Sequence, residues 1–196
     1  MDYKGTEKYI ISKIIKELPN NLYYHTIDHT LDVLKAVETY SSMEKIRNKE
    51  DLIILKTAAL FHDSGYIVQY FNNEVASIQI VCETLPEFGY SLRHIERISK
   101  LILSTEIPRK PKNIFEKILC DADLDYLGRD DFYMIGIRLL REWNENEIPT
   151  SLKEWYIQEI YFLEQHEYYT KSAIKLRLQK MKEHLAELKD LIGFNL

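Results

Sequence analysis

Glycine and proline are scarce in this sequence, which has six glycines and five prolines among its 196 residues. Their scarcity, combined with long runs rich in Leu, Ile, Lys and Glu, favours helices over sheets. A hydrophobic content of 45% with 29% charged residues is typical of an ordinary globular protein. The length suits one domain with a sizeable core, so we expect a single all-α domain over residues 1–196.

Cysteine is rarer still. Cys82 and Cys120 are the only two cysteines, they form no CxxC pair, and both lie in apolar segments with helical periodicity. We therefore expect two buried free thiols in a reducing compartment.

An excess of positive charge and a long hydrophobic run are also missing. The net charge is −5, so no overall positive field attracts nucleic acid or an anionic membrane. The apolar segment 9–18 is too short to span a bilayer and contains Lys13, Lys16 and Glu17. We expect a cytoplasmic protein with neither a membrane nor a nucleic-acid partner.

Helical periodicity recurs along the whole chain. Apolar residues spaced by three and four, with helix-capping residues at the ends, predict about nine helices. The predicted segments cover about 9–18, 28–40, 49–62, 73–83, 91–102, 114–119, 131–143, 151–168 and 170–192. The last helix is amphipathic and could support a homodimer, and His184 in it is predicted to face solvent among Lys and Glu residues.

One stretch, residues 58–66 with the sequence AALFHDSGY, joins an apolar helix to an adjacent His and Asp. Gly65 suits the left-handed position just past a helix C-terminus, so His62 and Asp63 are expected in the last helical turn. Neighbouring side chains on a helix point about 100° apart. Both can therefore reach one metal ion only if the ion lies near the helix end, between their two directions.

Other candidate metal ligands come from three separate segments. His25 and His29 are four residues apart and share a face if the turn between them is helical, with Thr26 or Asp28 as the N-cap. The remaining candidates are His94, Asp121, Asp123 and Asp125. A divalent metal accepts neutral imidazole and carboxylate ligands together, and a helical bundle can bring side chains from different helices to a central site.

The order of these groups resembles a known signature. The succession is His29, then the pair His62-Asp63, then Asp121. It is similar to the ordered H…HD…D pattern of the HD-domain superfamily of metal-dependent phosphohydrolases. Residues 24–33 resemble the YHNxxHxxDV motif of cyclic-nucleotide phosphodiesterases, with Thr26 in place of the Asn, and residues 58–66 resemble the AAxFHDxGY form of bacterial members. Further similar motifs begin at Glu74, Ile102, Asp121 and Phe162, so the resemblance covers about residues 20–175.

The resemblance implies an HD-type helical bundle that hydrolyses phosphate esters with the help of a metal ion. The metal ligands that it implies are His29, His62, Asp63 and Asp121. Such a metal would lower the pKa of a bound water and polarise a phosphoryl oxygen. The catalytic residues that it implies are His25, Asp63 and Glu74. His25 would protonate the leaving oxygen, and Glu74 or Asp121 would orient the attacking water.

The implied substrate is a small phosphate mono- or diester, and by analogy with the family a nucleotide. Arg109 and Lys112 would neutralise phosphate charge if their loop folds over the site. Tyr24 is close to the proposed ligands in the sequence and would stack on a base.

One departure from the family concerns the number of metal ions. Two-metal HD proteins carry further histidines after the HD pair, where this chain has Asn72, Asn73 and Glu74. Asn is a poor replacement for a His ligand, so we expect one divalent ion (Mn, Fe, Ni, Co, Zn or Mg) and a one-metal hydrolase. The alternative is a non-catalytic, metal-containing nucleotide sensor on the same fold.

Overall fold

The structure is a computed structural model that describes residues 1–193. Within this range all regular structure is helical, which confirms the predicted all-α class with about nine helices. The α-helices are α1 (Tyr3–Glu17), α2 (Ile27–Met43), α3 (Lys49–Phe61), α4 (Asn73–Thr84), α5 (Leu92–Leu103), α6 (Ile114–Asp123), α7 (Phe132–Glu145), α8 (Leu152–Gln165) and α9 (Lys171–Ile192). Three short 3-10 helices are η1 (Ser64–Ile67), η2 (Leu85–Phe88) and η3 (Asp125–Gly128). No helix within residues 1–193 is long and apolar enough to cross a membrane.

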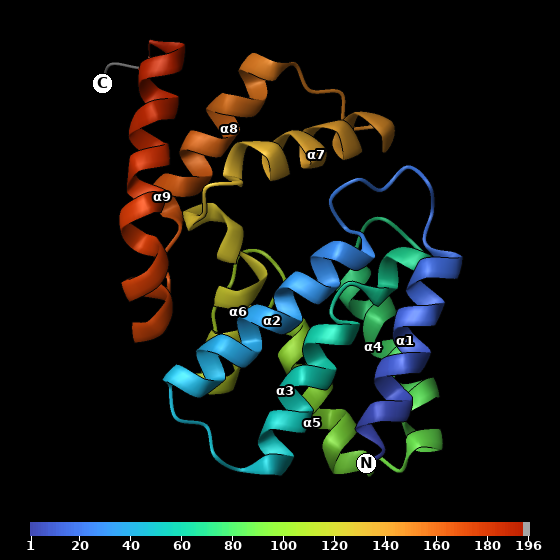
Figure 1. The fold of residues 1–196 in the computed structure, drawn as a ribbon. Coiled ribbons are helices and arrows are strands. Elements are labelled where there is room, and N and C mark those ends of the chain that lie inside the picture. The colour runs from blue at the N-terminus through green and yellow to red at the C-terminus, as the bar shows by residue number, and fades with distance from the viewer. Residues whose placement is uncertain (194–196) are drawn as a thin grey trace.

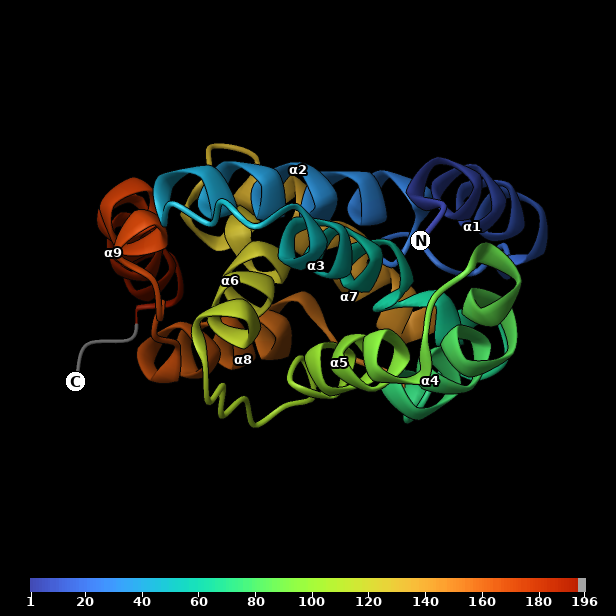
Figure 2. The ribbon, with the colours of Figure 1, turned by 90° about the horizontal axis from the view of Figure 1, so that it is seen from below.

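Helix α3 occupies the centre of the fold. Its second half, from Ile54 to Phe61, is buried apart from Lys56. A helix that is apolar on nearly all sides must be covered on all sides. Helix α2 packs against one side of α3 and α5 against another, as Figures 1 and 2 show. The C-terminal end of α3, where His62 follows, therefore lies inside the protein.

The segment after α6 ties the C-terminal helices to this core. The Asp121 carboxylate accepts hydrogen bonds from the backbone N–H groups of Tyr169 (2.9 Å) and Thr170 (2.8 Å), just before α9 begins. Further along, η3 packs closely on α9. A Cβ atom on Gly128 would lie 2.4 Å from the Arg177 carbonyl oxygen, so this approach requires glycine. Helix α9 is thus held in place by the same short stretch that carries the Asp-rich motif (Figure 1).

Two sequence predictions about burial are wrong. Cys82 is exposed, and only Cys120 is a buried thiol. His184 is 2% exposed rather than facing solvent. Its ring stacks on Phe132 at a centroid distance of 4.6 Å, and its Nδ1–H donates to the Leu127 carbonyl oxygen at 2.9 Å. Helix α9 contains many Lys and Glu residues, but one of its faces packs on α8 and η3.

Candidate metal centre

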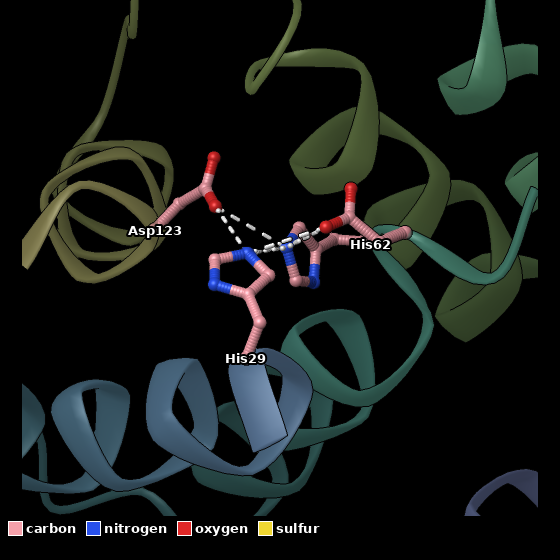
Figure 3. A group of neighbouring side chains, drawn as sticks. His29, His62 and Asp123 are labelled. Atoms are coloured by element: carbon pink, nitrogen blue, oxygen red, sulfur yellow. Dashed lines mark hydrogen bonds and ion pairs between the residues drawn. The ribbon is translucent and has the colours of Figure 1, made fainter. Parts of the chain in front are cut away.

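Four side chains from the ends of three helices converge in the structure. His29 lies in the first turn of α2, His62 and Asp63 directly follow α3, and Asp123 is the last residue of α6. Figure 3 shows His29, His62 and Asp123 pointing toward a common centre. One ligand atom from each of the four residues lies within 4.8 Å of the other three. The four side chains are between 0 and 13% exposed, so the group is shielded from bulk water.

The spacing of the donor atoms fits one divalent metal ion. The Nε2 atoms of His29 and His62 are 3.3 Å apart. Asp63 Oδ2 and Asp123 Oδ1 each lie 3.0–3.3 Å from these two nitrogens. Adjacent ligands of an octahedral ion with bonds of about 2.1 Å are about 3.0 Å apart. Asp63 Oδ2 is also buried without a hydrogen-bond partner, as expected of an atom whose natural partner is a cation.

Hydrogen bonding fixes the tautomer of His62. Its Nδ1 lies 2.8 Å from the carbonyl oxygen of Ala59. A carbonyl oxygen can only accept, so Nδ1 must carry the proton and Nε2 presents its lone pair to the centre of the group. This is the orientation that a metal-binding histidine requires.

The electrostatics of the group balance two imidazoles against two carboxylates. Burial alone would raise the pKa of the Asp123 carboxyl, but the charge of Arg109 and a hydrogen bond from His29 hold that pKa well below its usual value. Burial alone would lower the pKa of His29, but its hydrogen bond to Asp123 and the nearby negative charge of Asp63 raise it. The carboxylates are therefore charged at neutral pH, and protons compete with a cation for the imidazoles.

Asp123 takes the place in this group that the resemblance assigned to Asp121. Two positions apart on a helix means a rotation of about 200°, so the two side chains point to opposite faces of α6. Asp123 faces α2 and the end of α3, whereas Asp121 faces the start of α9 and accepts the hydrogen bonds of Tyr169 and Thr170 there. Burial raises the pKa of Asp121 to about 6.

The glycine after the His-Asp pair has a different role from the one expected. Gly65 is not in the left-handed region and belongs to η1. A Cβ atom on Gly65 would lie 1.9 Å from the Asn73 carbonyl oxygen, so glycine is required for close packing of η1 on α4. Ser77 of α4 reinforces this packing, because its hydroxyl accepts from the Gly65 N–H (2.7 Å) and donates to the His62 carbonyl oxygen (2.8 Å).

His25 stands beside the metal centre in a fixed orientation. Its Nδ1 is hydrogen-bonded to Oε1 of Glu142, a fully buried carboxylate of α7. Its Nε2 lies 3.1 Å from the Tyr66 hydroxyl, and the rings of His25 and Tyr66 stack at 4.1 Å. Glu142 Oε2 also accepts from three consecutive backbone N–H groups, those of Tyr23, Tyr24 and His25, at 2.8–3.0 Å.

Glu142 was not predicted to belong to the site. It lies 117 residues after His25, in a segment without any recognised motif, so no local pattern connects the two. Burial alone would raise the pKa of Glu142, but the hydrogen bond and charge of His25 and the backbone N–H groups lower it. Glu142 is therefore ionised at neutral pH, and it holds both the ring of His25 and the chain that leads into α2.

Glu142→Gln is expected to destabilise the fold by about 1–3 kcal/mol at pH 7, because an amide cannot accept all the hydrogen bonds that the carboxylate accepts. The folded-state pKa of Glu142 is below its ordinary value of 4.5. Its contribution is thus present above that pH and lost as the pH falls through the folded value. Urea unfolding of both proteins from pH 7 to pH 3 should show the difference shrinking with acid. A difference independent of pH would contradict the ionised, hydrogen-bonded carboxylate.

A cavity of about 380 Å³ opens beside the metal centre. His25, Asp63 and Asp123 line it, together with three residues predicted to act on the substrate or the water, Tyr24, Glu74 and Arg109. Tyr24 is buried with its ring 4.6 Å from that of His29, and burial raises the pKa of the half-buried Glu74. Lys112, by contrast, is exposed and lines a separate surface hollow.

Arg109 is held by the protein itself. Its guanidinium forms an ion pair with Asp123 and donates to the carbonyl oxygens of Thr105 (3.0 Å) and Cys120 (2.9 Å). It therefore orients a member of the metal centre while facing the same cavity. A role in phosphate binding stays a prediction.

Comparison with known proteins agrees with this fold. A predicted HD superfamily hydrolase from an uncultured Thermotogales bacterium is similar over 95% of this chain and 91% of its own, with 20% identity and a TM-score of 0.63. Bacillus subtilis YpgQ, solved in complex with ADP, is similar over 97% of both chains, with 16% identity and a TM-score of 0.65. No curated protein matches the chain. The family model of the HD domain matches residues 26–125, just over half of the chain and the segment that carries all four converging side chains. This chain therefore belongs to the HD-domain family.

Proposed function

We propose that this protein hydrolyses a nucleotide, as a phosphate mono- or diester, with one divalent metal ion held by His29, His62, Asp63 and Asp123. The observation that carries the proposal is the convergence of two imidazole nitrogens and two carboxylate oxygens at the spacing of metal ligands. Within residues 1–193 no other group of three or more such side chains comes as close together, which favours a single ion. A bound divalent ion supplies Lewis acidity toward a phosphoryl oxygen and lowers the pKa of a coordinated water.

His25 is the proposed general acid. It lines the same cavity as Asp63 and Asp123, and its Nε2 is the ring atom on the side away from Glu142. Glu142 accepts the Nδ1–H bond, which orients the ring toward the cavity. A proton on Nε2 can then pass to the oxygen of the departing alcohol. The half-buried Glu74 faces the same cavity and is the proposed residue that orients the attacking water.

A nucleotide is favoured as the substrate by the size and lining of the cavity. At about 380 Å³ it falls in the range of sites that bind drug-sized ligands. Its walls beyond the metal centre are largely aromatic and aliphatic, which suits a planar base. The ADP in the complex of YpgQ supports the same class of ligand.

The competing proposal is a metal-containing nucleotide sensor without turnover. The hydrogen-bonded chain from Glu142 through His25 to Tyr66 favours an enzyme, because a sensor has no need of an oriented acid. Nucleotide binding without release of product would identify a sensor.

Metal content is the direct test of the proposed centre. Protein purified without a chelator or a metal-affinity tag is expected to hold about one equivalent of divalent metal per chain. Removal of the metal should abolish phosphate-ester hydrolysis, and addition of Mn²⁺, Ni²⁺ or Zn²⁺ should restore it. Two equivalents would contradict the single-ion proposal, and hydrolysis that persists without metal would contradict the mechanism.

A further inference from the structure

Glu159 is a buried carboxyl group that the fold leaves without a partner. It lies in α8, is 6% exposed, and its Oε2 has no hydrogen-bond partner. A buried polar atom without a partner costs free energy, so proteins rarely keep one without a use. Glu159 lines the cavity beside the metal centre. The other cavity that it lines measures only about 10 Å³, which is too small for any substrate group.

Aromatic side chains surround Glu159 in the larger cavity. Trp155 and Phe162 lie four residues before and three residues after it, so the three share one face of α8. Trp143 of α7 also lines the cavity, and its ring meets that of Trp155 edge-on at 5.0 Å. The lining of the cavity thus combines the carboxylates Asp63 and Asp123 of the metal centre with aromatic rings around the unpaired Glu159.

The carboxyl group in such surroundings can both donate and accept a hydrogen bond. Burial raises the pKa of Glu159 to about 7, so a large fraction carries a proton at neutral pH. A protonated carboxyl offers one O–H donor and one carbonyl acceptor side by side. Each of the common nucleobases has an edge with an adjacent donor and acceptor, which is the complementary pattern.

We propose that Glu159 binds the hydrogen-bonding edge of a nucleobase held against Trp143, Trp155 and Phe162, and so selects nucleotides among phosphate esters. The inference rests on the proposed function, because the metal centre would hold the phosphate group of the same ligand in the same cavity. A small organic cation is the alternative ligand for a carboxyl group among aromatic rings. The volume of about 380 Å³ favours the nucleoside, since a small ammonium group would leave most of the cavity unfilled.

The two tryptophans provide a direct readout of binding. They are the only tryptophans in the sequence, and both line this cavity. Quenching of their fluorescence by adenosine, guanosine, cytidine or uridine would report occupancy of the aromatic part without any catalytic step. Choline serves as the probe for the cationic alternative.

The test compares Glu159→Leu and Glu159→Gln with the control Glu164→Leu on the same helix, where the side chain pairs with Lys189 of α9 and does not line the cavity. Leucine removes donor and acceptor, and we expect nucleoside affinity to fall about 10–100-fold. Glutamine retains one donor and one acceptor, so affinity should stay within about threefold. The kcat/KM for a nucleotide should fall with Glu159→Leu mainly through KM. Hydrolysis of p-nitrophenyl phosphate, which has no nucleobase, should fall much less than hydrolysis of the nucleotide, and metal content should match that of Glu164→Leu.

Thermal unfolding separates this role from a structural one. If Glu159 serves a ligand, Glu159→Leu removes an unpaired buried carboxyl and should raise Tm by about 2–8 °C. A lower Tm, or equal losses toward nucleotides and p-nitrophenyl phosphate, would mean that Glu159 supports the fold, and the proposal would be wrong. Unchanged nucleoside affinity in Glu159→Leu, or choline binding that depends on Glu159, would overturn it as well.

The same measurements distinguish this inference from the proposed function. Nucleoside binding that depends on Glu159, in a metal-loaded protein that hydrolyses no ester, would leave the inference standing and remove the hydrolase. Metal-dependent hydrolysis of p-nitrophenyl phosphate without nucleoside binding would leave the hydrolase standing and remove the inference.

Discussion

Asp123→Asn is expected to lose the bound metal, with an affinity reduced more than about 100-fold, whereas Asp121→Asn should retain it. Loss of a residue that merely orients a metal ligand costs about 10–100-fold, and loss of a ligand should cost more. Asp123 Oδ1 lies 3.1 Å from His29 Nε2 and 3.3 Å from His62 Nε2, at the centre of the group. The Asp121 carboxylate instead accepts the N–H groups of Tyr169 and Thr170. Metal content of the two purified variants, measured side by side, is the readout.

Stability alone would not separate the two variants. Asp121→Asn weakens the hydrogen bonds at the start of α9 and should cost about 1–3 kcal/mol. Asp123→Asn removes the carboxylate that neutralises Arg109 and should also destabilise the fold, since Arg109 is nearly buried. Metal retention must therefore be measured under conditions in which both variants are folded. Loss of metal from Asp121→Asn, with retention in Asp123→Asn, would return the ligand role to Asp121.

The motif pointed to Asp121 as the ligand, whereas the structure brings Asp123 to the two histidines. Residues 121–125 contain three aspartates in alternation, and the resemblance to the family signature placed the ligand at the first of them, Asp121. The helical period separates Asp121 and Asp123 onto opposite faces, but which face meets the histidines depends on how α6 is rotated. That rotation is set by packing against α2, α3 and α5, and it cannot be deduced from the motif.

The fold class and most of the candidate metal centre could be predicted because their signals are local. Low glycine and proline content and the spacing of apolar residues predict helices, and the His-Asp pair stands at the end of the central helix as expected. Glu142 and Glu159 could not be predicted. Each shares its helix with other glutamates, Glu145 in α7 and Glu154 and Glu164 in α8, and which of them is buried depends on the tertiary arrangement of the two helices.

His25→Ala is expected to retain the metal but to slow turnover about 10²–10⁴-fold on a substrate with an alkoxide leaving group, the usual cost of a lost general acid. None of the four proposed ligands is His25, so metal content should stay near the wild-type value. On a p-nitrophenyl ester the loss should be much smaller, because nitrophenolate is a weak base that departs without a proton. The contrast between the two substrates is therefore the signature of an acid, and kcat for both should be measured in the same metal-loaded preparation.

His94→Ala provides the matched control, since His94 caps the start of α5 and does not line the cavity. It should leave turnover of both substrates unchanged apart from a small loss of stability. Equal slowing of the two esters by His25→Ala would mean that His25 positions the substrate or the fold rather than donating a proton. Loss of metal from the same variant would extend the metal centre to His25, and the chain from Glu142 to Tyr66 would then serve to orient a ligand. Because Glu142 contacts Nδ1 and Tyr66 contacts Nε2, both ring nitrogens of His25 are held, and the ring keeps one orientation from one turnover to the next.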